Sequence, residues 1–258
     1  MDFSVFKNKY FIEGELVVLT ALHIGSGKEE AEHDAPFMKE DGNFYIPGSS
    51  FRGYMRTKLE RFLLDENNFK FKDKKTQDLL NMADILLLFG YTNLFSKEKN
   101  VSQIEDRIEE KLGFSKEDRK NFSSMAGRIH IADMPIISNV NSIRRDGIKI
   151  DRNTGTTEAS AKFDYDIIPA GAKFKFTIEL ENIEPYQLDL IALALKDIYD
   201  EGDLFGGKLS RGIGKCQLEI SKIQYIDKNN VKNYIFKKEK SDMDKNNFFK
   251  FANLELVD

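Results

Sequence analysis

Four stretches of the chain alternate apolar and polar residues as β-strands do. The first covers residues 10–20, where aromatic and β-branched residues gather. The later strands are predicted at residues 127–135, at 172–182, and from Cys216 through Ile220 to Tyr225. Pro135 is expected to end the second strand, because proline cannot continue a ladder in the interior of a sheet.

Two helices are predicted between these strands. Phe51, Met55, Leu59 and Phe62 recur at helical spacing after the sequence "YIPG", and Ser49 or Ser50 is the expected N-cap. Residues 185–200 form a strong amphipathic pattern. The resulting order, βαββαβ, predicts an α+β, ferredoxin-like or RRM-like core in a single domain. That core is expected at about residues 10–64, 126–140 and 172–228.

Three excursions interrupt or follow this core. Residues 65–125 are polar except for the apolar run at 79–90, so we expect a mainly helical insertion in which Gly90 caps the helix. Residues 141–171 mix basic residues, turn formers and β-prone pieces, which predicts an extended, thumb-like hairpin or arm. The polar C-terminal tail, about residues 237–258, favours a mobile extension over a partner-docking segment.

Composition narrows the class of protein. The 258-residue chain has 32% charged residues, one cysteine and three histidines. A disulfide framework and a thiolate metal cluster are therefore excluded, and a histidine-rich metal site is disfavoured. Cys216 is expected to be a buried thiol rather than a nucleophile. No apolar run approaches the roughly 18 residues that a membrane span needs, and the N-terminus lacks a signal-peptide core. We therefore predict a cytoplasmic protein with no membrane partner.

The net charge of −4 hides two local surpluses of positive charge. Residues 49–61 carry Arg52, Arg56, Lys58 and Arg61 against Glu60. Residues 205–216 carry three cations and no acid: Lys208, Arg211 and Lys215. Because phosphates are held by groups within about one Debye length (roughly 10 Å), the acidic total is compatible with basic sites for nucleic acid.

The sequence "GGKLSRGIGKC", residues 206–216, combines these cations with four glycines, which let backbone N–H groups approach a phosphate closely. It is neither a Walker motif nor a dinucleotide fingerprint, since it leads into a strand rather than a helix. Phosphate contact is favoured over a flexible turn. The predicted contacts are Gly206, Gly207, Lys208, Ser210, Arg211, Gly212, Gly214 and Lys215.

The sequence "PGSSFRGYMR" places Ser49 and Ser50 at a helix start, with Arg52 and Arg56 one turn apart. A helix N-terminus can bind an anion, and spaced arginines can contact successive phosphates. A capped helix with a solvated basic face explains the same residues, so both interpretations stay open for this motif alone.

Six segments in order along the chain resemble one known family. They are "YFIEGELVVLTALHIGSG", "DAPFMKEDGNFYIPGSSFRGYMR", "LLFG", "GRIHIADMP", "IDRNTGTTEASAKFDYDIIPAGAKFKF" and "LFGGKLSRGIGKC". Together they resemble the RAMP superfamily of CRISPR-associated proteins. More narrowly, they are similar to the Cas-seven-like backbone subunits of type III effector complexes, in the small III-D-like form.

The resemblance implies a subunit that stacks along a CRISPR RNA (crRNA) with other subunits, further copies of itself among them. By that similarity the basic helix and the glycine-rich loop hold guide phosphates. The arm, with Arg144, Arg145 and Arg152, is similar to the thumb that wedges into the guide–target duplex. The family's cleaving aspartate matches Asp34, which would cut target RNA with Mg²⁺ or another divalent cation as cofactor.

Three functional hypotheses follow. The first is an endoribonuclease subunit in which Asp34 acts as general base or metal ligand, with neighbouring His33 as a surface residue. The second is a non-catalytic, crRNA-binding structural subunit. The third is a repeat-RNA-processing endoribonuclease that uses histidine chemistry. His23, near a strand end, is expected to be structural or to contact the backbone, and His130 alternates with apolar neighbours on a strand.

Overall fold

The computed structural model describes residues 5–27, 35–63, 70–92, 108 and 124–257. Its centre is an antiparallel sheet with the strand order β12-β13-β1-β11-β7. The bounds of these strands are β1 Asn8–Val18, β7 Ile129–Ile131, β11 Lys173–Glu181, β12 Asp203–Leu204 and β13 Lys215–Asp227. The two-residue strand β14, Ser241–Asp242, pairs with β13.

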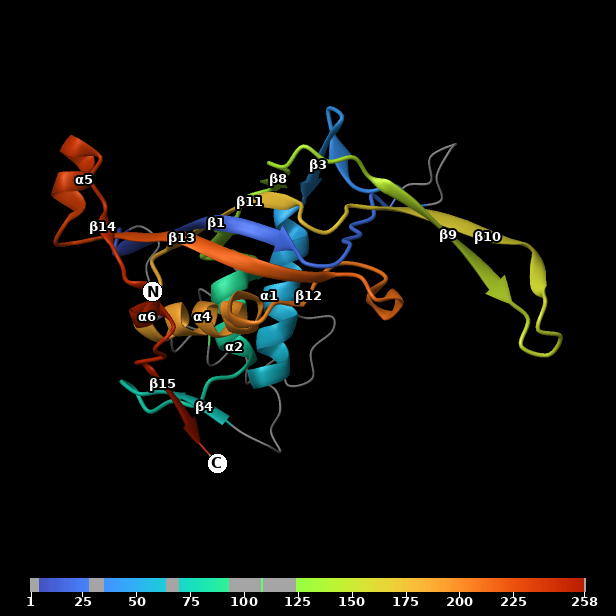
Figure 1. Ribbon diagram of the computed structural model, residues 1–258. Coiled ribbons are helices and arrows are strands. Elements are labelled where there is room, and N and C mark those ends of the chain that lie inside the picture. Colours follow the sequence, from blue (N-terminus) through green and yellow to red (C-terminus); the bar gives the residue numbers. More distant parts are fainter. Residues whose placement is uncertain (1–4, 28–34, 64–69, 93–107, 109–123, 258) are drawn as a thin grey trace.

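The four main strands have the ferredoxin-like arrangement. β1 is the central strand and pairs with both β11 and β13, while β7 pairs with the far side of β11. Helix α1, Gly48–Leu63, follows the first strand, and helix α4, Pro185–Asp200, precedes the fourth. Figure 1 shows both helices on one side of the sheet, with α2, Met82–Phe89, and α6, Lys245–Phe248, beside them. The predicted α+β, βαββαβ core is therefore confirmed.

Alternating side chains build the core between the sheet and these helices. In β11 the core-facing residues Phe174, Phe176, Ile178 and Leu180 are fully buried. The intervening residues lie on the opposite face, where Lys173 Nζ is 2.6 Å from a carboxylate oxygen of Glu15. This is the pattern expected of a strand with one buried and one polar face.

Two predicted boundaries were wrong. Helix α1 begins at Gly48, so Ser49 and Ser50 lie inside its first turn and neither is the N-cap. A Cβ atom on Gly48 would lie 2.1 Å from the carbonyl oxygen of Ile131, so the residue at the helix start must be a glycine to pack against β7. The second strand ends at Ile131, and Pro135 belongs instead to the short strand β8, Met134–Pro135. β8 pairs with β3, Asn43–Ile46, which also pairs with β2, Lys39–Glu40.

The described part of the 65–125 insertion contains strand as well as helix. Its elements are β4 Lys70–Asp73, α2 Met82–Phe89, β5 Gly90–Thr92 and, at its end, β6 Ser124–Ala126. All eight residues of α2 are buried, so this helix belongs to the hydrophobic core. The expected cap holds, because Gly90 ends α2 with φ +75°. The rest of the insertion lies outside the described residues.

The arm is a two-stranded antiparallel hairpin, as predicted. Its strands are β9, Ile143–Ile150, and β10, Thr157–Ile167, joined by the turn that contains the sequence "RNTG". Figure 1 shows the hairpin extending away from the body. A long, two-stranded projection of this kind is a suitable shape for inserting into a partner.

The C-terminal tail packs against the body, which contradicts the predicted mobility. It follows α5, Val231–Lys237, and contains β14, α6 Lys245–Phe248 and β15 Leu254–Val257. Phe248 is 2% exposed, and the ring of Phe249 stacks on Tyr199 of α4 at 4.4 Å between centroids. β15 pairs with β4 of the insertion. A few well-placed apolar side chains therefore anchor a segment whose composition is polar.

No helix in the described part of the chain is long and apolar enough to cross a membrane.

Candidate nucleic-acid interface

RRM domains bind bases on aromatic side chains of the exposed sheet face. Here the face opposite the helices carries ion pairs, such as Lys9 with Glu179 at 2.7 Å and Lys173 with Glu15 at 2.6 Å. The two segments predicted to contact phosphate meet elsewhere, at the end of the sheet where α1 begins.

A groove of about 810 Å³ lies between α1, the segment after β1 and the beginning of the glycine-rich loop. It is lined from α1 by Ser50, Gly53, Tyr54, Thr57, Lys58 and Arg61, and from the loop by Phe205, Gly206, Gly207 and Leu209. The structure thus brings together the two elements that the sequence singled out, 150 residues apart along the chain.

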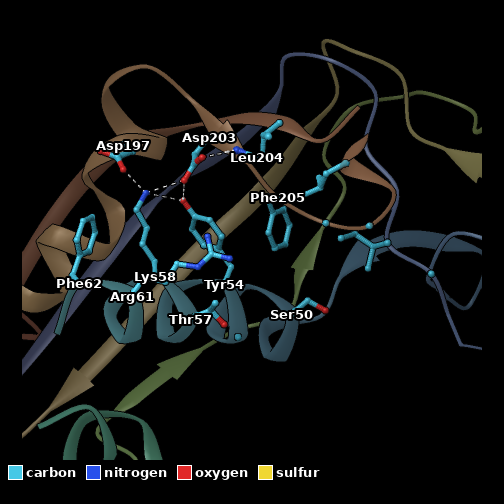
Figure 2. Close-up of a pocket in the computed structure, with 16 residues that line it drawn as sticks. Ser50, Tyr54, Thr57, Lys58, Arg61, Phe62, Asp197, Asp203, Leu204 and Phe205 are labelled. Carbon is cyan, nitrogen blue, oxygen red and sulfur yellow. Dashed lines mark hydrogen bonds and ion pairs between the residues drawn. The ribbon is translucent and has the colours of Figure 1, made fainter. Parts of the chain in front are cut away.

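Lys58 connects three elements at one end of this groove. Its Nζ atom lies 2.7 Å from a carboxylate oxygen of Asp197 in α4 and 2.8 Å from one of Asp203 in β12. The Tyr54 hydroxyl donates a hydrogen bond of 2.6 Å to the same oxygen of Asp203, as Figure 2 shows. We call these four residues the Lys58 cluster.

The electrostatics of the cluster follow from these contacts. Burial alone would raise the pKa of Asp203, but hydrogen bonds from Lys58 and Tyr54 outweigh it and hold that pKa below its usual value. Burial and the adjacent carboxylate raise the pKa of Tyr54, so its hydroxyl stays a donor. Lys58 and Arg61 balance Asp197 and Asp203, so the groove lining is close to neutral.

The two arginines predicted to bind RNA from α1 are not among the residues that line the groove. The guanidinium of Arg52 lies over the ring of Phe89 in α2, 5.8 Å from the centroid. Arg56 pairs with Glu60 at 2.8 Å. Ser50 lines the groove, whereas Ser49 is exposed beside it. RNA contacts by these residues stay predictions.

The start of α1 already has an anionic partner. The backbone N–H of Gly48 donates to a carboxylate oxygen of Asp133 at 2.7 Å. A carboxylate is stabilised at this position by the unpaired N–H groups of the first turn and by the helix dipole. A phosphate near Ser49 or Ser50 would therefore have to share the helix start with Asp133.

The glycine-rich loop is docked on the body and is not a flexible turn. Gly207 N–H donates to the carbonyl of His23 at 2.9 Å, and Gly214 N–H donates to that of Ala21 at 2.6 Å. Gly206 has φ +96°, and a Cβ atom there would lie 2.7 Å from the carbonyl oxygen of His23. Residues 209–211 form one turn of 3₁₀-helix, η3. The exposed residues of the loop are Ser210, Arg211, Gly212 and Lys215.

Two cations of the loop lie on aromatic rings of the arm. Lys208 Nζ is 4.9 Å from the ring centroid of Tyr165, and the Arg211 guanidinium is 5.3 Å from that of Phe163. These are cation–π distances. The predicted phosphate-binding loop and the root of the arm therefore form one surface.

The predicted RNA contacts on the arm are exposed. Arg144 lies 3.7 Å from a carboxylate oxygen of Asp164 on the neighbouring strand, and Arg145 pairs in register with Tyr165. Arg152 lies in the turn at the tip, where the side chain of Asp151 accepts two backbone N–H groups. RNA binding by these arginines also stays a prediction.

Asp34, the predicted catalytic and metal-binding residue, and His33 lie outside the described residues. The segments on either side are paired: Ser26 N–H donates to Pro36 O at 3.2 Å, and Met38 N–H donates to Ile24 O at 2.9 Å. Ala35 O accepts the N–H of Asp166 in the arm at 3.1 Å. Within the described ranges, no group of three histidine, cysteine, aspartate or glutamate side chains could hold a metal.

The remaining candidates behave as the sequence suggested. His23 is buried, and its Nδ1 lies 2.6 Å from the carbonyl oxygen of Asp166, so it is the backbone contact that we expected. Burial lowers its pKa. His130 is exposed between the buried residues Ile129 and Ile131 of β7. Cys216 is fully buried, which raises the pKa of its thiol to about 12.

Sequence reasoning missed the roles of Tyr54, Lys58 and Asp203. Tyr54 and Lys58 are one turn apart in α1, but their partner Asp203 is 145 residues from Lys58, and no local pattern indicates it. Reasoning also missed Phe163 and Tyr165, although their alternation with Asp164 and Asp166 in "KFDYDI" marks one apolar side of a strand.

The ferredoxin-like sheet, the projecting hairpin and the cationic glycine-rich loop define an α+β protein with features of a nucleic-acid-binding domain. Comparison with known proteins makes this more specific. The RAMP superfamily profile matches residues 15–217, and the chain belongs to that superfamily.

Two curated relatives match this chain over most of their length. A protein of Methanocaldococcus jannaschii named "CRISPR system Cms endoribonuclease Csm3" is 25% identical over 233 residues, which cover 86% of this chain and 84% of that protein. A protein of the same name from Enterococcus italicus is 26% identical over 226 residues, covering 85% of this chain and 94% of its own. The family resemblance seen in the sequence is thereby confirmed.

Proposed function

We propose that this chain is a backbone subunit of a type III CRISPR effector complex, which binds the crRNA backbone and cleaves bound target RNA through Asp34. The observation that carries the proposal is the meeting of α1, the glycine-rich loop and the root of the arm at one end of the sheet. The names and nearly full-length matches of the curated relatives support the same function.

In this proposal the chain has two tasks in binding. Lys208, Arg211 and Lys215, with the exposed backbone of the loop, contact guide phosphates without reading the sequence. The arm, with Arg144, Arg145 and Arg152, inserts between guide and target. The partners are crRNA, target RNA and other subunits of the complex, further copies of this chain among them.

For cleavage, the carboxylate of Asp34 accepts the proton of the target 2′-hydroxyl as that oxygen attacks the adjacent phosphorus in line. The bond from this phosphorus to the 5′-oxygen of the next nucleotide breaks, which leaves a 2′,3′-cyclic phosphate and a 5′-hydroxyl that takes its proton from water. A divalent cation such as Mg²⁺, when bound, would neutralise charge on the phosphate. The described residues offer no three-ligand cluster for such an ion, so we derive no step through it. The metal requirement is a proposal that chelation tests.

The test is target cleavage by the guide-loaded complex, with Mg²⁺ and with EDTA, for the wild type and for Asp34→Asn. The variant is expected to lose about 10²–10⁴ in rate, as loss of a general base typically does, with guide binding unchanged. Asp41→Asn, in the exposed turn between β2 and β3, is the matched control and should cleave normally.

Three results would contradict the proposal. Normal cleavage by Asp34→Asn would refute the role of that carboxylate. Full assembly with guide and target but no cleavage by the wild type would favour a non-catalytic, crRNA-binding structural subunit instead. Metal-free cleavage of precursor RNA by the isolated chain would favour the processing endoribonuclease.

A further inference from the structure

A second apolar cluster, separate from the main core, lies at the root of the arm. Its buried members are Ala21, Tyr165, Ile167 and Ile213, with Ala35 and Phe163 packed against them. They come from four segments: the chain after β1, the chain after the Asp34 loop, strand β10 of the arm, and the glycine-rich loop. These are the segments to which the proposed function assigns phosphate binding, wedging and cleavage.

The aromatic pair in this cluster has a defined geometry. Phe163 and Tyr165 lie on the same side of β10, with ring centroids 6.4 Å apart and planes 19° apart. Phe163 pairs in register with Gly147, and a Cβ atom on Gly147 would lie 2.2 Å from the Phe163 ring. The glycine therefore leaves the space that the Phe163 ring occupies across the hairpin.

The two cations above this pair lie on its rings. Lys208 is 4.9 Å from the Tyr165 ring centroid and Arg211 is 5.3 Å from that of Phe163, and among the described residues neither cation has an ion pair with a carboxylate. A carboxylate partner would neutralise them, whereas an aromatic face orients a cation and leaves its charge to attract phosphate. Packing on aromatic rings can therefore fix the positions of Lys208 and Arg211 without neutralising their charges.

The backbone of the same strand reaches the Asp34 loop. Asp166 N–H donates to Ala35 O at 3.1 Å, and Asp166 O accepts from the buried His23 ring at 2.6 Å. The His23 ring in turn meets Tyr165 edge-on, 5.6 Å between centroids. Tyr165 therefore packs beside the contacts that hold Ala35, the residue directly after Asp34.

We propose that Phe163 and Tyr165 are positioning residues for target cleavage: they hold the arm, the glycine-rich loop and the end of the Asp34 loop in one arrangement. This inference rests on the proposed function. Neither residue contacts the reacting atoms. Their effect is on where the guide phosphates and the wedged target lie relative to the cleaving loop, and misplacement by about 1 Å can cost a hundredfold in rate.

The test uses the guide-loaded complex with Phe163→Leu, which keeps apolar bulk but removes the ring, and Phe163→Tyr, which keeps the ring. Gly147→Ala is a second variant that displaces the ring without changing it. The measurements are the single-turnover cleavage rate at saturating target, the Kd for guide, the Tm, and hydrogen exchange over residues 35–38, 163–168 and 205–214.

Phe163→Leu and Gly147→Ala are expected to cleave at least tenfold more slowly, with guide Kd raised no more than about threefold, because the loop cations remain but lose their orientation. Exchange should be faster in all three segments, and Phe163→Tyr should match the wild type in every measurement. If Phe163 were needed only for folding, the variants would have a lower Tm and a smaller yield of assembled complex. The complexes that do form would then cleave target at the wild-type rate.

The proposal is overturned if Phe163→Leu or Gly147→Ala cleaves at the wild-type rate. It is also overturned if hydrogen exchange becomes faster in the arm but not around Ala35. A wild-type complex that does not cleave would refute the proposed function instead. The exchange data would then still decide whether the aromatic pair couples the three segments.

Discussion

Replacing Lys58 tests whether one ammonium group holds α1, α4 and β12 together at the groove. The Lys58 side chain is 11% exposed, while its partners Asp203 and Asp197 are 33% and 60% exposed. Lys58→Met keeps most of the aliphatic stem and removes the charge. Among the described residues, Asp203 then keeps two donors, the Tyr54 hydroxyl and the Leu204 backbone N–H.

The loss in free energy of unfolding expected for Lys58→Met lies between two limits. Exposed ion pairs contribute about 0–1 kcal/mol, whereas removing one partner of a buried pair costs about 3–5 kcal/mol. Because Asp203 is one-third exposed and keeps two donors, we expect Lys58→Met to lower the free energy of unfolding by about 2 kcal/mol. For a chain of this size that is a fall in Tm of roughly 4–8 °C. Asp197→Asn should cost less than about 1 kcal/mol, since Asp197 is mostly exposed.

The assay is urea unfolding of the wild type and both variants at pH 7 and at several acidic pH values. The pKa of Asp203 is lowered in the folded state, so its contribution is complete above its ordinary value of 3.8 and is lost as pH falls through the lower folded pKa. The difference in free energy of unfolding between the wild type and Lys58→Met should therefore persist from pH 7 to pH 5 and disappear in stronger acid. An Lys58→Met protein as stable as the wild type at pH 7, or a difference unchanged in strong acid, would refute this reasoning.

Four further results are expected. Gly206→Ala should destabilise the protein more than Gly212→Ala in thermal unfolding, because both residues have positive φ but only the Gly206 Cβ atom would strike backbone; equal losses would contradict this. Cys216 should resist alkylation at pH 8 until urea unfolds the chain, because burial raises its pKa to about 12; rapid labelling of the native protein would show that the thiol is accessible. Phe248→Ala should cost about 3–5 kcal/mol in the same unfolding assay if the tail is packed on the core, and a mobile tail would make it neutral. Arg211→Gln should weaken the binding of unrelated guide sequences equally in filter-binding titrations. For the wild type, a plot of the logarithm of the binding constant against the logarithm of salt concentration should have a slope near −3, as expected for about four phosphate contacts; an affinity independent of salt would argue against a basic interface.

The periodic parts of the fold could be predicted because the main strands of the sheet and helices α1 and α4 each have one buried side. Leu188, Ile191, Leu195 and Ile198 mark the core side of α4, and all are buried. The tail could not be predicted in the same way. Its buried residues, Phe248 and Leu254, lie in the short apolar-rich sequence "FFKFANLELV" at the end of a polar tail. The partners of that sequence, Tyr199 and strand β4, are distant along the chain.

The sequence singled out two segments that meet at the groove, but not the side chains that line it. Helical spacing shows that Phe51, Met55 and Leu59 face the core, but the sequence does not show which flank of that stripe faces the groove. Arg52 lies on the flank beside α2, and Ser50 lies on the flank that lines the groove. Only the packing of α1 between α2 and the glycine-rich loop decides between them.

The position of β1 at the centre of the sheet also governs how the chain is synthesised. β1 ends at Val18, but its neighbours begin at Lys173 and Lys215. At the ribosome's typical rate of about 5–20 residues per second, roughly 10–40 s pass before β13 emerges to complete the ladder. Until β11 emerges, both edges of this aromatic, β-prone strand are unpaired and open to other chains, and one edge stays open until β13 follows. We therefore expect the yield of native protein in cells to depend on translation rate and on chaperones that cover this strand more than on the final stability of the fold.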